Sequence, residues 1–350
     1  MHFSQVSAEF ADKFFELVSA ANNVAITGHV SPDGDSIASV LSVYEVISSR
    51  YPEKKIRIIY SAEPQNHLSI FKNYHKIEFV SDIADNLDQT DLLIMLDGSQ
   101  FSRFSVSPEK LQSILHTVCL DHHSSPISEF SLSLVVPSSS SCAQLVYLAL
   151  CREVTITPQL AEIFLMGILG DTGNFAYLKP EQTDTLMIAK KMIDISRVEI
   201  QEFMSRYESI SKKVFNTVKV LMKNTQFSSA PNWPDFQYSY LDKEYIEDKR
   251  LSDSEISEAC GIYMAPYLRN VSGYSWGFVV TPRNNGECSI SARSLPNSVS
   301  VRDLMERTGL GGGHDRAAGG TFRKTDMDVE VSTSITWLID WLSDHAPVLS

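Results

Sequence analysis

The stretch "GHVSPDGDSIAS", residues 28–39, places one imidazole and two carboxylates close together as His29, Asp33 and Asp35, spaced H-x-x-x-D-x-D. Imidazole nitrogen and carboxylate oxygen are ligands that divalent metal ions accept together. The same residues also suit a polar turn, because Pro32-Asp33-Gly34 is a favourable turn tripeptide and Asp35 or Ser36 could cap a following helix. The stretch alone therefore leaves a metal site and a helix-capping turn as alternatives.

Further acidic and imidazole side chains follow three other apolar runs. They are Asp97 after "LLIML", Asp121, His122 and His123 at the end of "TVCL", and Asp171 after "IFLMGIL". Single members have ordinary alternatives, since Asp97 before Gly98 could be a turn residue and Asp171 could end a helix that Gly173 stops. The "DHH" triplet is harder to explain in this way, because such groups directly after a buried strand are costly unless they are paired or bind metal.

These side chains must be positioned by alternating strands and helices. Apolar runs predict buried strands at 23–27, 55–61, 90–97, 116–121 and 131–138, with helical periodicity between several of them, notably at 36–50 and 141–152. Such alternation predicts an α/β fold with a mostly parallel, doubly wound sheet. Ligands bind these sheets outside the carboxyl ends of the strands, and three of the predicted strands each deliver a carboxylate or an imidazole to that edge.

The convergence of several acidic side chains has an electrostatic consequence. Carboxylates that meet without cations would repel one another strongly. A carboxylate placed between two ions can bridge them at about 3.5–4 Å, the separation used in phosphoryl chemistry. The combined pattern therefore predicts a centre of two divalent metal ions, with Mn²⁺ as the expected ion and Mg²⁺ or Co²⁺ as alternatives.

The remainder of the sequence predicts a second, smaller domain. A helix with Thr157 as its cap and Pro158 in its first turn is followed by charged helical sequence to about residue 225, and "FSSAPNWPDF" is the best linker candidate. Strands are then predicted at 236–241, 275–283 and 287–295, and helices at 252–268, 301–309 and 333–344. We expect a metal-binding domain at 1–195, a helical connector and linker at 196–232, and a C-terminal α/β domain at 233–350, with a cleft between the two domains.

The composition argues against several classes of protein. The 350 residues are 43% hydrophobic and carry a net charge of −13, which disfavours a protein that coats long nucleic acid. The five cysteines are an odd number without a C-x-x-C pair, so buried free thiols are expected rather than a disulfide framework or a zinc knuckle. The first residues lack the basic start of a signal peptide, and the most apolar stretch is too short to cross a bilayer. The sequence predicts a cytoplasmic protein without a membrane segment.

A glycine-rich segment, "GLGGGHDRAAGG", lies near the end of the sequence and contains Gly311, Gly312, Gly313 and His314. Three successive glycines let backbone N–H groups approach an anion closely. A flexible turn is the ordinary alternative for such a segment. Arg316 just after the motif is expected to be a solvated surface residue.

Together these segments resemble a known family. "HVSPDGDS", "LDGSQFSR", "LDHHSS" and "GILGDTGNF" are similar, in order and rough spacing, to the four motifs of the DHH phosphoesterases. The string "GGGH…AAGG" and the preceding "SISARS" resemble the signature of their DHH-associated C-terminal domain. The resemblance implies that one metal ion is held by His29, Asp33 and Asp97, and the other by Asp35, Asp97, His122 and Asp171, with Asp97 bridging.

The resemblance also implies roles for residues beyond the metal ligands. His123 would face the substrate phosphate, either to hold its oxygen or to protonate the leaving group, and Asp121 would orient a histidine. Arg103 lies where the family often has an arginine near the second motif, so it could contribute to substrate binding. The alternative is that Arg103 is an ordinary exposed surface residue. Substrate binding is expected from the C-terminal domain, through Arg293, Ser294, Gly311, Gly312, Gly313 and His314.

The implied activity is that of nano-RNases. These enzymes hydrolyse very short oligoribonucleotides to 5′-mononucleotides and also remove phosphate from 3′-phosphoadenosine 5′-phosphate (pAp). The alternative substrates are cyclic di-AMP or its linear product pApA, although no membrane, PAS or GGDEF segment precedes the core as it does in the membrane-anchored cyclic dinucleotide enzymes. The "GGGH" string argues against manganese-dependent inorganic pyrophosphatases, and the OB-fold of processive DNA exonucleases is not found.

Other readings stay open to different degrees. A catalytically silent nucleotide-binding protein would lack some ligands, yet every expected position is filled. After "DTGNF" the sequence "AYLKPEQTDTL" departs from the family pattern, which leaves substrate preference undecided. The sequence does not decide whether the protein forms a homodimer.

Overall fold

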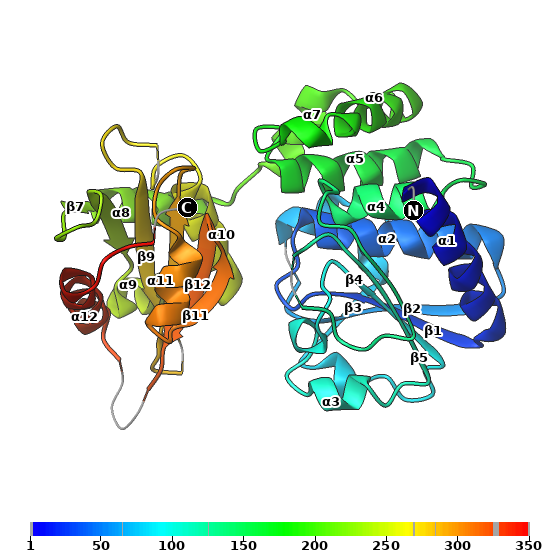
Figure 1. Cartoon of the computed structure of the whole chain (residues 1–350), viewed down its shortest axis with the longest axis horizontal. Helices are drawn as coiled ribbons and strands as arrows, with labels where there is room; N and C mark the ends of the chain where they lie inside the picture. The colour runs from blue at the N-terminus through cyan, green and yellow to red at the C-terminus, as the bar shows by residue number, and fades with distance from the viewer. Residues whose placement is uncertain are drawn as a thin grey trace. The chain divides into compact units, whose positions relative to one another are not determined.

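The computed structural model describes residues 3–64, 66–124, 126–268, 270–283, 285–324 and 329–348. The chain forms two compact units, Met1–Ser209 and Ile210–Ser350, and each contains its own six-stranded sheet (Figure 1). The first unit carries the residues of the predicted metal centre, and the second carries the glycine-rich segment. The predicted α/β class, a mostly parallel sheet followed by a smaller α/β domain, is confirmed.

A parallel sheet forms the centre of the first unit. Its strands are β1 (Asn23–Gly28), β2 (Lys55–Ser61), β3 (Ile77–Val80), β4 (Leu92–Leu96), β5 (His116–Asp121) and β6 (Leu132–Val135). They lie in the order β3-β2-β1-β4-β5-β6, and every neighbouring pair is parallel. The order changes direction between β1 and β4, which is where open parallel sheets bind ligands. Only β3 was not predicted, because it is short and mostly lies near the surface.

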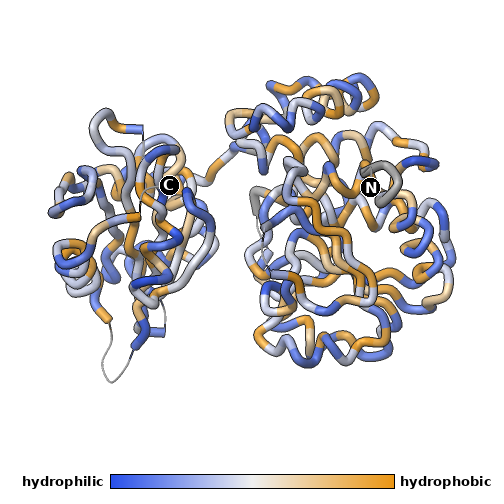
Figure 2. Tube along the Cα trace, viewed as in Figure 1, coloured by the Kyte–Doolittle hydropathy of each residue, from blue (hydrophilic) through white to orange (hydrophobic). Residues whose placement is uncertain are grey.

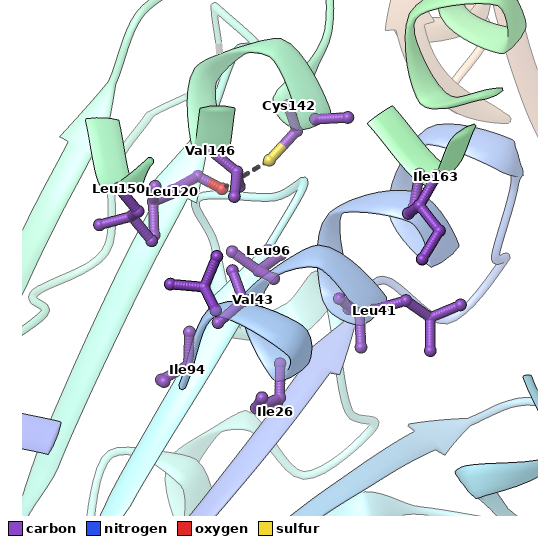
Figure 3. Packing of buried hydrophobic residues seen from close by; sticks show 14 of the residues in the cluster. Ile26, Leu41, Val43, Ile94, Leu96, Leu120, Cys142, Val146, Leu150 and Ile163 are labelled. Carbon is purple, nitrogen blue, oxygen red and sulfur yellow. Dashed lines mark hydrogen bonds between the residues drawn. The ribbon is translucent and has the colours of Figure 1, made fainter. Parts of the chain in front are cut away.

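Helices cover one face of this sheet. They are α1 (Phe3–Ala20), α2 (Gly34–Arg50), α4 (Cys142–Leu150) and α5 (Pro158–Thr172). Successive strand side chains point to opposite faces, so Ile26, Ile94 and Leu96 pack against these helices, as Figure 3 shows beside Leu41 and Val43 of α2. The strands are also the most continuously hydrophobic part of this unit in Figure 2.

Shorter segments cover the opposite face. Leu93 and Met95 point there and pack with Phe104 and with Leu111 of the short helix α3 (Pro108–Leu111). Two further helices, α6 (Asp184–Ser196) and α7 (Ile200–Tyr207), lie on the outer side of α5 (Figure 1). The sheet is therefore buried on both faces. Polar functional side chains are consequently expected at the ends of the strands and not on the faces of the sheet.

Helix α5 approaches α2 and α4 closely at Gly167. A Cβ atom at this position would lie 2.5 Å from Cβ of Ala143, 2.8 Å from Cβ of Ala38 and 2.9 Å from Oδ1 of Asp35. These distances are shorter than van der Waals contact, so only glycine allows this packing. The close approach also brings α5 against Asp35, one of the predicted metal ligands.

The second unit contains a mixed sheet. Its strands are β7 (Gln226–Ser228), β8 (Phe236–Tyr240), β9 (Trp276–Pro282), β10 (Cys288–Ser294), β11 (Gly311–His314) and β12 (Ala317–Phe322). They lie in the order β11-β12-β10-β9-β8-β7, and all pairs are antiparallel except β8 with β9. One face packs against α8 (Lys212–Lys223), α9 (Lys243–Lys249) and α10 (Asp253–Met264), and the other against α11 (Val301–Arg307) and α12 (Val331–Asp344).

The glycine-rich segment forms a β-hairpin rather than a flexible turn. Strand β11 pairs with β12 and stands at the end of the strand order, so it is an edge strand of the sheet. A Cβ atom on Gly311 would overlap the backbone carbonyl of Gly319, and therefore the two strands require glycine at this contact. Arg316, expected in solvent, is instead partly buried: its Nη1 lies 3.3 Å from the carbonyl oxygen of Val299 and 3.4 Å from Oγ of Ser294.

Two expectations from composition can be compared with the structure. The five cysteines are free and buried, as expected. Among the described segments, none of the helices combines the length and the apolar character that a membrane span requires.

We expect Gly167→Ala to destabilise the first unit. The added methyl group would overpack the contact among α5, α2 and α4, which typically costs about 1–3 kcal/mol. Gly261→Ala in α10 is the matched control, because a Cβ atom there meets nothing within 4 Å. Alanine should be neutral or stabilising at this exposed helical position, by up to about 1 kcal/mol. Thermal and denaturant unfolding of both variants tests this, and equal midpoints would contradict the packing argument.

Candidate metal centre

Three neighbouring strands deliver the predicted ligands to one edge of the parallel sheet. His29 directly follows β1, Asp97 directly follows β4, and Asp121 is the last residue of β5, with the two histidines after it. Because β1, β4 and β5 are adjacent and parallel, their carboxyl ends meet at the same edge. Asp171, near the end of α5, joins them there, since it lies 3.2 Å from Nε2 of His122.

Three overlapping groups of side chains at this edge could hold a metal ion. They are His29, Asp33 and Asp97; Asp35, His122 and Asp171; and Asp97, His122 and His123. Within each group, one ligand atom per residue lies within 4.8 Å of the others. The first two groups, with Asp97 added to the second, are the two sets that the sequence predicted. The structure thus brings all six predicted ligands together.

Asp97 lies at the centre of these groups. Its Oδ2 is 3.3 Å from Nε2 of His29, and its Oδ1 is 3.5 Å from Nε2 of His122. The side chain is 2% exposed, and the backbone is left-handed with φ of 62°. A left-handed backbone at a residue other than glycine is uncommon and typically costs about 1–3 kcal/mol. The two oxygens therefore face two different histidines, as a bridging carboxylate requires.

The turn after β1 caps helix α2 and also places two carboxylates in the cluster. Asp33 is the N-cap of α2 and accepts hydrogen bonds from the backbone N–H groups of Asp35 and Ser36. Both oxygens of Asp35 accept hydrogen bonds from the start of α4, at 2.6 Å from Cys142 N and 2.9 Å from Ala143 N. A helix cap is therefore present, but it is Asp33 and not Asp35 or Ser36 as the sequence suggested, because the helix begins two residues earlier, at Gly34. The turn places the two carboxylates beside the histidines.

His122 and His123 are each oriented by a contact of the ring nitrogen Nδ1. Nδ1 of His122 donates to the carbonyl oxygen of Ser139 at 3.3 Å, which leaves Nε2 facing the carboxylates. Nδ1 of His123 lies 2.7 Å from Oδ1 of Asp121, and the same oxygen accepts from the backbone N–H groups of both histidines. Asp121 therefore holds His123 in place, as a carboxylate beside a functional imidazole often does.

The buried polar atoms of this cluster fit bound cations. In the part of the chain that the structure describes, Oδ1 of Asp97 and Nε2 of His122 are buried without a hydrogen-bond partner. Nε2 of His122 has carboxylate oxygens near it, at 3.2 Å for Oδ2 of Asp171 and 3.5 Å for Oδ1 of Asp97. Leaving such atoms unsatisfied is costly, and a mixed set of carboxylate oxygens and imidazole nitrogens suits divalent ions such as Mn²⁺. The residues present therefore fit the predicted metal ions.

The crowding of charged groups shifts their pKa values in opposite directions. Burial alone would lower the pKa of His29 and His122, but the neighbouring carboxylates outweigh it and raise both to about 10. Burial and the charges of Asp97 and Asp171 raise the pKa of Asp35 well above its usual value. Burial raises the pKa of Asp97 as well, but the two histidines overcome it and keep the pKa well below its usual value. Protons on the histidines thus balance the carboxylates when metal is absent.

The other predicted residues lie outside this cluster. Arg103 is exposed, and its carbonyl oxygen accepts a hydrogen bond from Val30 N beside the end of β1. In the second unit, Arg293 and His314 both pair across the sheet with Ala317, so their side chains lie on the same face. Ser294 is buried and its Oγ contacts the carbonyl oxygen of Asp315, which supports the hairpin turn rather than offering a free hydroxyl.

Several residues that support the site were not singled out from the sequence. Ser139 orients His122, the first backbone groups of α4 hold Asp35, and Oγ of Ser36 is hydrogen-bonded to the buried hydroxyl of Tyr60 at 3.1 Å. The "SSSS" run before "CAQLV" was a signal of a helix cap, but nothing local indicated its distant partners. Gly28 and Gly167 could not be singled out from the sequence either, because only the folded structure shows which atoms fill the space around them.

Metal binding should strengthen as the pH rises from about 6.5 toward 10. The histidines must lose their protons to bind a metal ion, and their pKa values of about 10 keep them protonated in the metal-free protein at neutral pH. Binding of Mn²⁺ at pH 7 to 9 should therefore release protons. Calorimetric titration in buffers with different ionisation enthalpies measures this release. Uptake of protons, or affinity independent of pH, would contradict the assignment of these histidines.

The sequence matches the DHH family, N-terminal domain, over residues 23–168 and the DHHA1 domain over residues 236–338. It is 26% identical over 306 residues to a bifunctional oligoribonuclease and PAP phosphatase NrnA of Thermus thermophilus, covering 87% of this chain and 86% of that protein. It is 25% identical over 323 residues, 88% of this chain, to a membrane protein–large ribosomal subunit bL9 fusion protein of Aster yellows witches'-broom phytoplasma, but spans only 36% of that relative's length. A solved structure, an exopolyphosphatase-related protein from Bacteroides fragilis, has the same fold, with a TM-score of 0.80 at 20% identity and 96% of each chain covered. The chain therefore belongs to the DHH family and carries a DHHA1 domain after its DHH domain.

Proposed function

We propose that the protein is a metal-dependent phosphoesterase that hydrolyses very short oligoribonucleotides to 5′-mononucleotides and dephosphorylates pAp. The observation that carries this proposal is the set of overlapping histidine and aspartate groups around Asp97 at the carboxyl ends of three parallel strands. The Thermus thermophilus relative supports the choice of substrates, because its name describes these two activities and it aligns with most of the chain.

Two ions would be held in the proposed centre, with Asp97 shared between them. His29 and Asp33 complete the first set, and Asp35, His122 and Asp171 complete the second. Bound divalent ions at such a centre supply an activated water molecule and neutralise the charge that develops on the phosphoryl group. The chain itself contributes the orientation: backbone N–H groups fix Asp33 and Asp35, and Ser139 fixes the ring of His122.

His123 is assigned to the substrate rather than to a metal. Asp121 contacts Nδ1 and orients the ring, and the proposed role of His123 is to donate a hydrogen bond to a phosphate oxygen or to protonate the leaving group. The imidazole of His123 outweighs the effect of burial and lowers the pKa of Asp121, so the carboxylate stays ionised and keeps the ring oriented. Asp121 is thus a positioning residue for His123.

The second unit would bind the nucleotide. Arg293 suits a phosphate group because its guanidinium forms paired hydrogen bonds with phosphate oxygens. His314 lies on the same sheet face, separated from Arg293 by one strand. The edge strand β11 presents backbone N–H groups on its unpaired side, and its three glycines allow a ligand to approach them. These features support a site for the phosphate and base of a short substrate.

The comparison of substrates tests the proposed activity. With Mn²⁺ present, purified protein should hydrolyse RNA of two to five nucleotides and pAp, and chelation should abolish both activities. Relative kcat/KM for a mixed-sequence dinucleotide, pApA and cyclic di-AMP decides between nano-RNase activity and the cyclic dinucleotide alternative. Hydrolysis of none of these compounds would reject the proposal.

Asp97→Asn should reduce metal binding from two ions to at most one. The amide cannot supply the negative charge that a bridging carboxylate places between two cations. Metal content measured after equilibration with Mn²⁺ gives a readout that does not depend on activity. Asp85→Asn is the matched control, because Asp85 is an exposed aspartate paired with Lys110 and should leave the metal content unchanged. Two ions in Asp97→Asn would show that Asp97 does not bridge.

His123→Ala should lower kcat by about 10²- to 10⁴-fold, the usual contribution of a general acid, while the metal content stays at two ions. Asp121→Asn should lower kcat less and should alter the pH profile, because the amide no longer holds the imidazole in its orientation. Steady-state kinetics across pH, with metal analysis of each variant, measures both effects. Loss of metal in His123→Ala would instead identify His123 as a ligand.

A further inference from the structure

Helix α8 has a charge distribution unlike that of the chain as a whole. It contains four lysines and no acidic residue, whereas the whole chain carries a net charge of −13. Its apolar residues Val214, Val218 and Leu221 are buried in the core of the second unit. The lysines are consequently left on the exposed side of the helix.

A hollow of about 320 Å³ lies between α8 and α9 and is lined mainly by lysines. Lys213, Lys219 and Lys223 come from α8, and Lys249 comes from α9. Lys213 pairs with Glu255 at 2.9 Å and Lys249 pairs with Asp248 at 2.6 Å. Over the described ranges, the other two lysines form no ion pair. The residues that line the hollow thus include four lysines and no acidic residue, which gives the lining itself a positive charge.

An exposed aromatic ring adjoins these lysines. Phe215 is 54% exposed, and Nζ of Lys219 lies 5.9 Å from the centre of its ring. Residues four positions apart share one face of a helix, so Phe215, Lys219 and Lys223 form a continuous stripe. Sites for single-stranded nucleic acid combine two features. Cations neutralise the phosphates, and a neighbouring aromatic ring stacks on a base.

We propose that this α8–α9 surface, formed by Phe215, Lys219, Lys223 and Lys249, binds a single-stranded oligonucleotide. The lysines contact its phosphates, and the ring of Phe215 stacks on a base. The inference rests on the proposed function in its choice of a nucleic acid as the occupant. An anionic membrane fits less well, because membrane-surface helices insert their apolar face and the apolar face of α8 is already buried in the core.

Binding to fluorescein-labelled penta-adenylate tests this surface in the full-length protein. EDTA in the buffer removes metal and prevents hydrolysis during the fluorescence anisotropy measurement. The double variant Lys219→Glu/Lys223→Glu should bind at least about tenfold more weakly at low salt, and the slope of log K against log salt should fall by about two. Phe215→Ala should weaken binding about fivefold or more without changing this slope. Lys13→Glu, at an exposed position of α1 in the first unit, is the control and should bind like the unchanged protein.

Several outcomes would overturn the inference. Unchanged binding in the double lysine variant would show that the α8–α9 surface does not bind the oligonucleotide. No effect of Phe215→Ala, together with full displacement of the oligonucleotide by inorganic polyphosphate, would show a general polyanion site instead. Charge-dependent sedimentation with anionic phospholipid vesicles, but not with the oligonucleotide, would favour a membrane.

The same experiment separates this inference from the proposed activity. If the protein hydrolyses no oligonucleotide but binds penta-adenylate through these lysines, only the proposed activity fails. If it hydrolyses dinucleotides while the double variant binds penta-adenylate normally, only the α8–α9 surface fails. Unfolding midpoints of the variants should match that of the unchanged protein, because the substituted side chains are exposed.

Discussion

The first unit depends on holding several carboxylates close together with little access to water. Asp35 and Asp97 are 1% and 2% exposed, and the charge of Asp97 is among the causes that raise the pKa of Asp35. Buried like charges are tolerated only when opposite charges or protons neutralise them. Protonated His29 and His122 serve this purpose in the metal-free chain, and the proposed divalent ions would replace those protons. In the proposed centre, folding and metal binding would therefore be coupled through the same few side chains.

The fold supplies a second kind of support, through backbone N–H groups. A carboxylate has two oxygens with several lone pairs, so it can accept hydrogen bonds and still face a cation. Asp35 uses both oxygens to accept from the start of α4, where the helix dipole favours negative charge. Asp33 accepts both hydrogen bonds from the start of α2 with Oδ1 alone, and its Oδ2 lies 3.7 Å from Nε2 of His29. Helix capping and metal binding, which the sequence presents as alternatives, are compatible in the structure because they use different lone pairs of the same groups.

The parts of the site that could be predicted are those set by local pattern and chain direction. Apolar runs that end in aspartate or histidine indicate parallel strands with polar carboxyl ends, and parallel pairing alone brings those ends together. The contact of Asp35 with Cys142 spans 107 residues, and no local pattern reports it. Gly167 is similar, because its role depends on which helices cross there. The glycine-rich hairpin was not predicted as strands, since β-propensity reflects side chains that pack on a sheet, and glycine has none.

The net charge of the chain and the charge of its surfaces act over different distances. At physiological salt, charges separated by more than about 8 Å are largely screened from one another. In the proposed binding mode, the lysines of the α8–α9 surface would therefore determine what binds there, even though the chain as a whole carries a charge of −13. An oligonucleotide that extended far beyond this surface would meet a predominantly acidic protein, so its additional phosphates would add little to the binding affinity. A local basic surface on an acidic chain thus favours short anionic ligands over long ones, in agreement with the short oligoribonucleotides proposed as substrates.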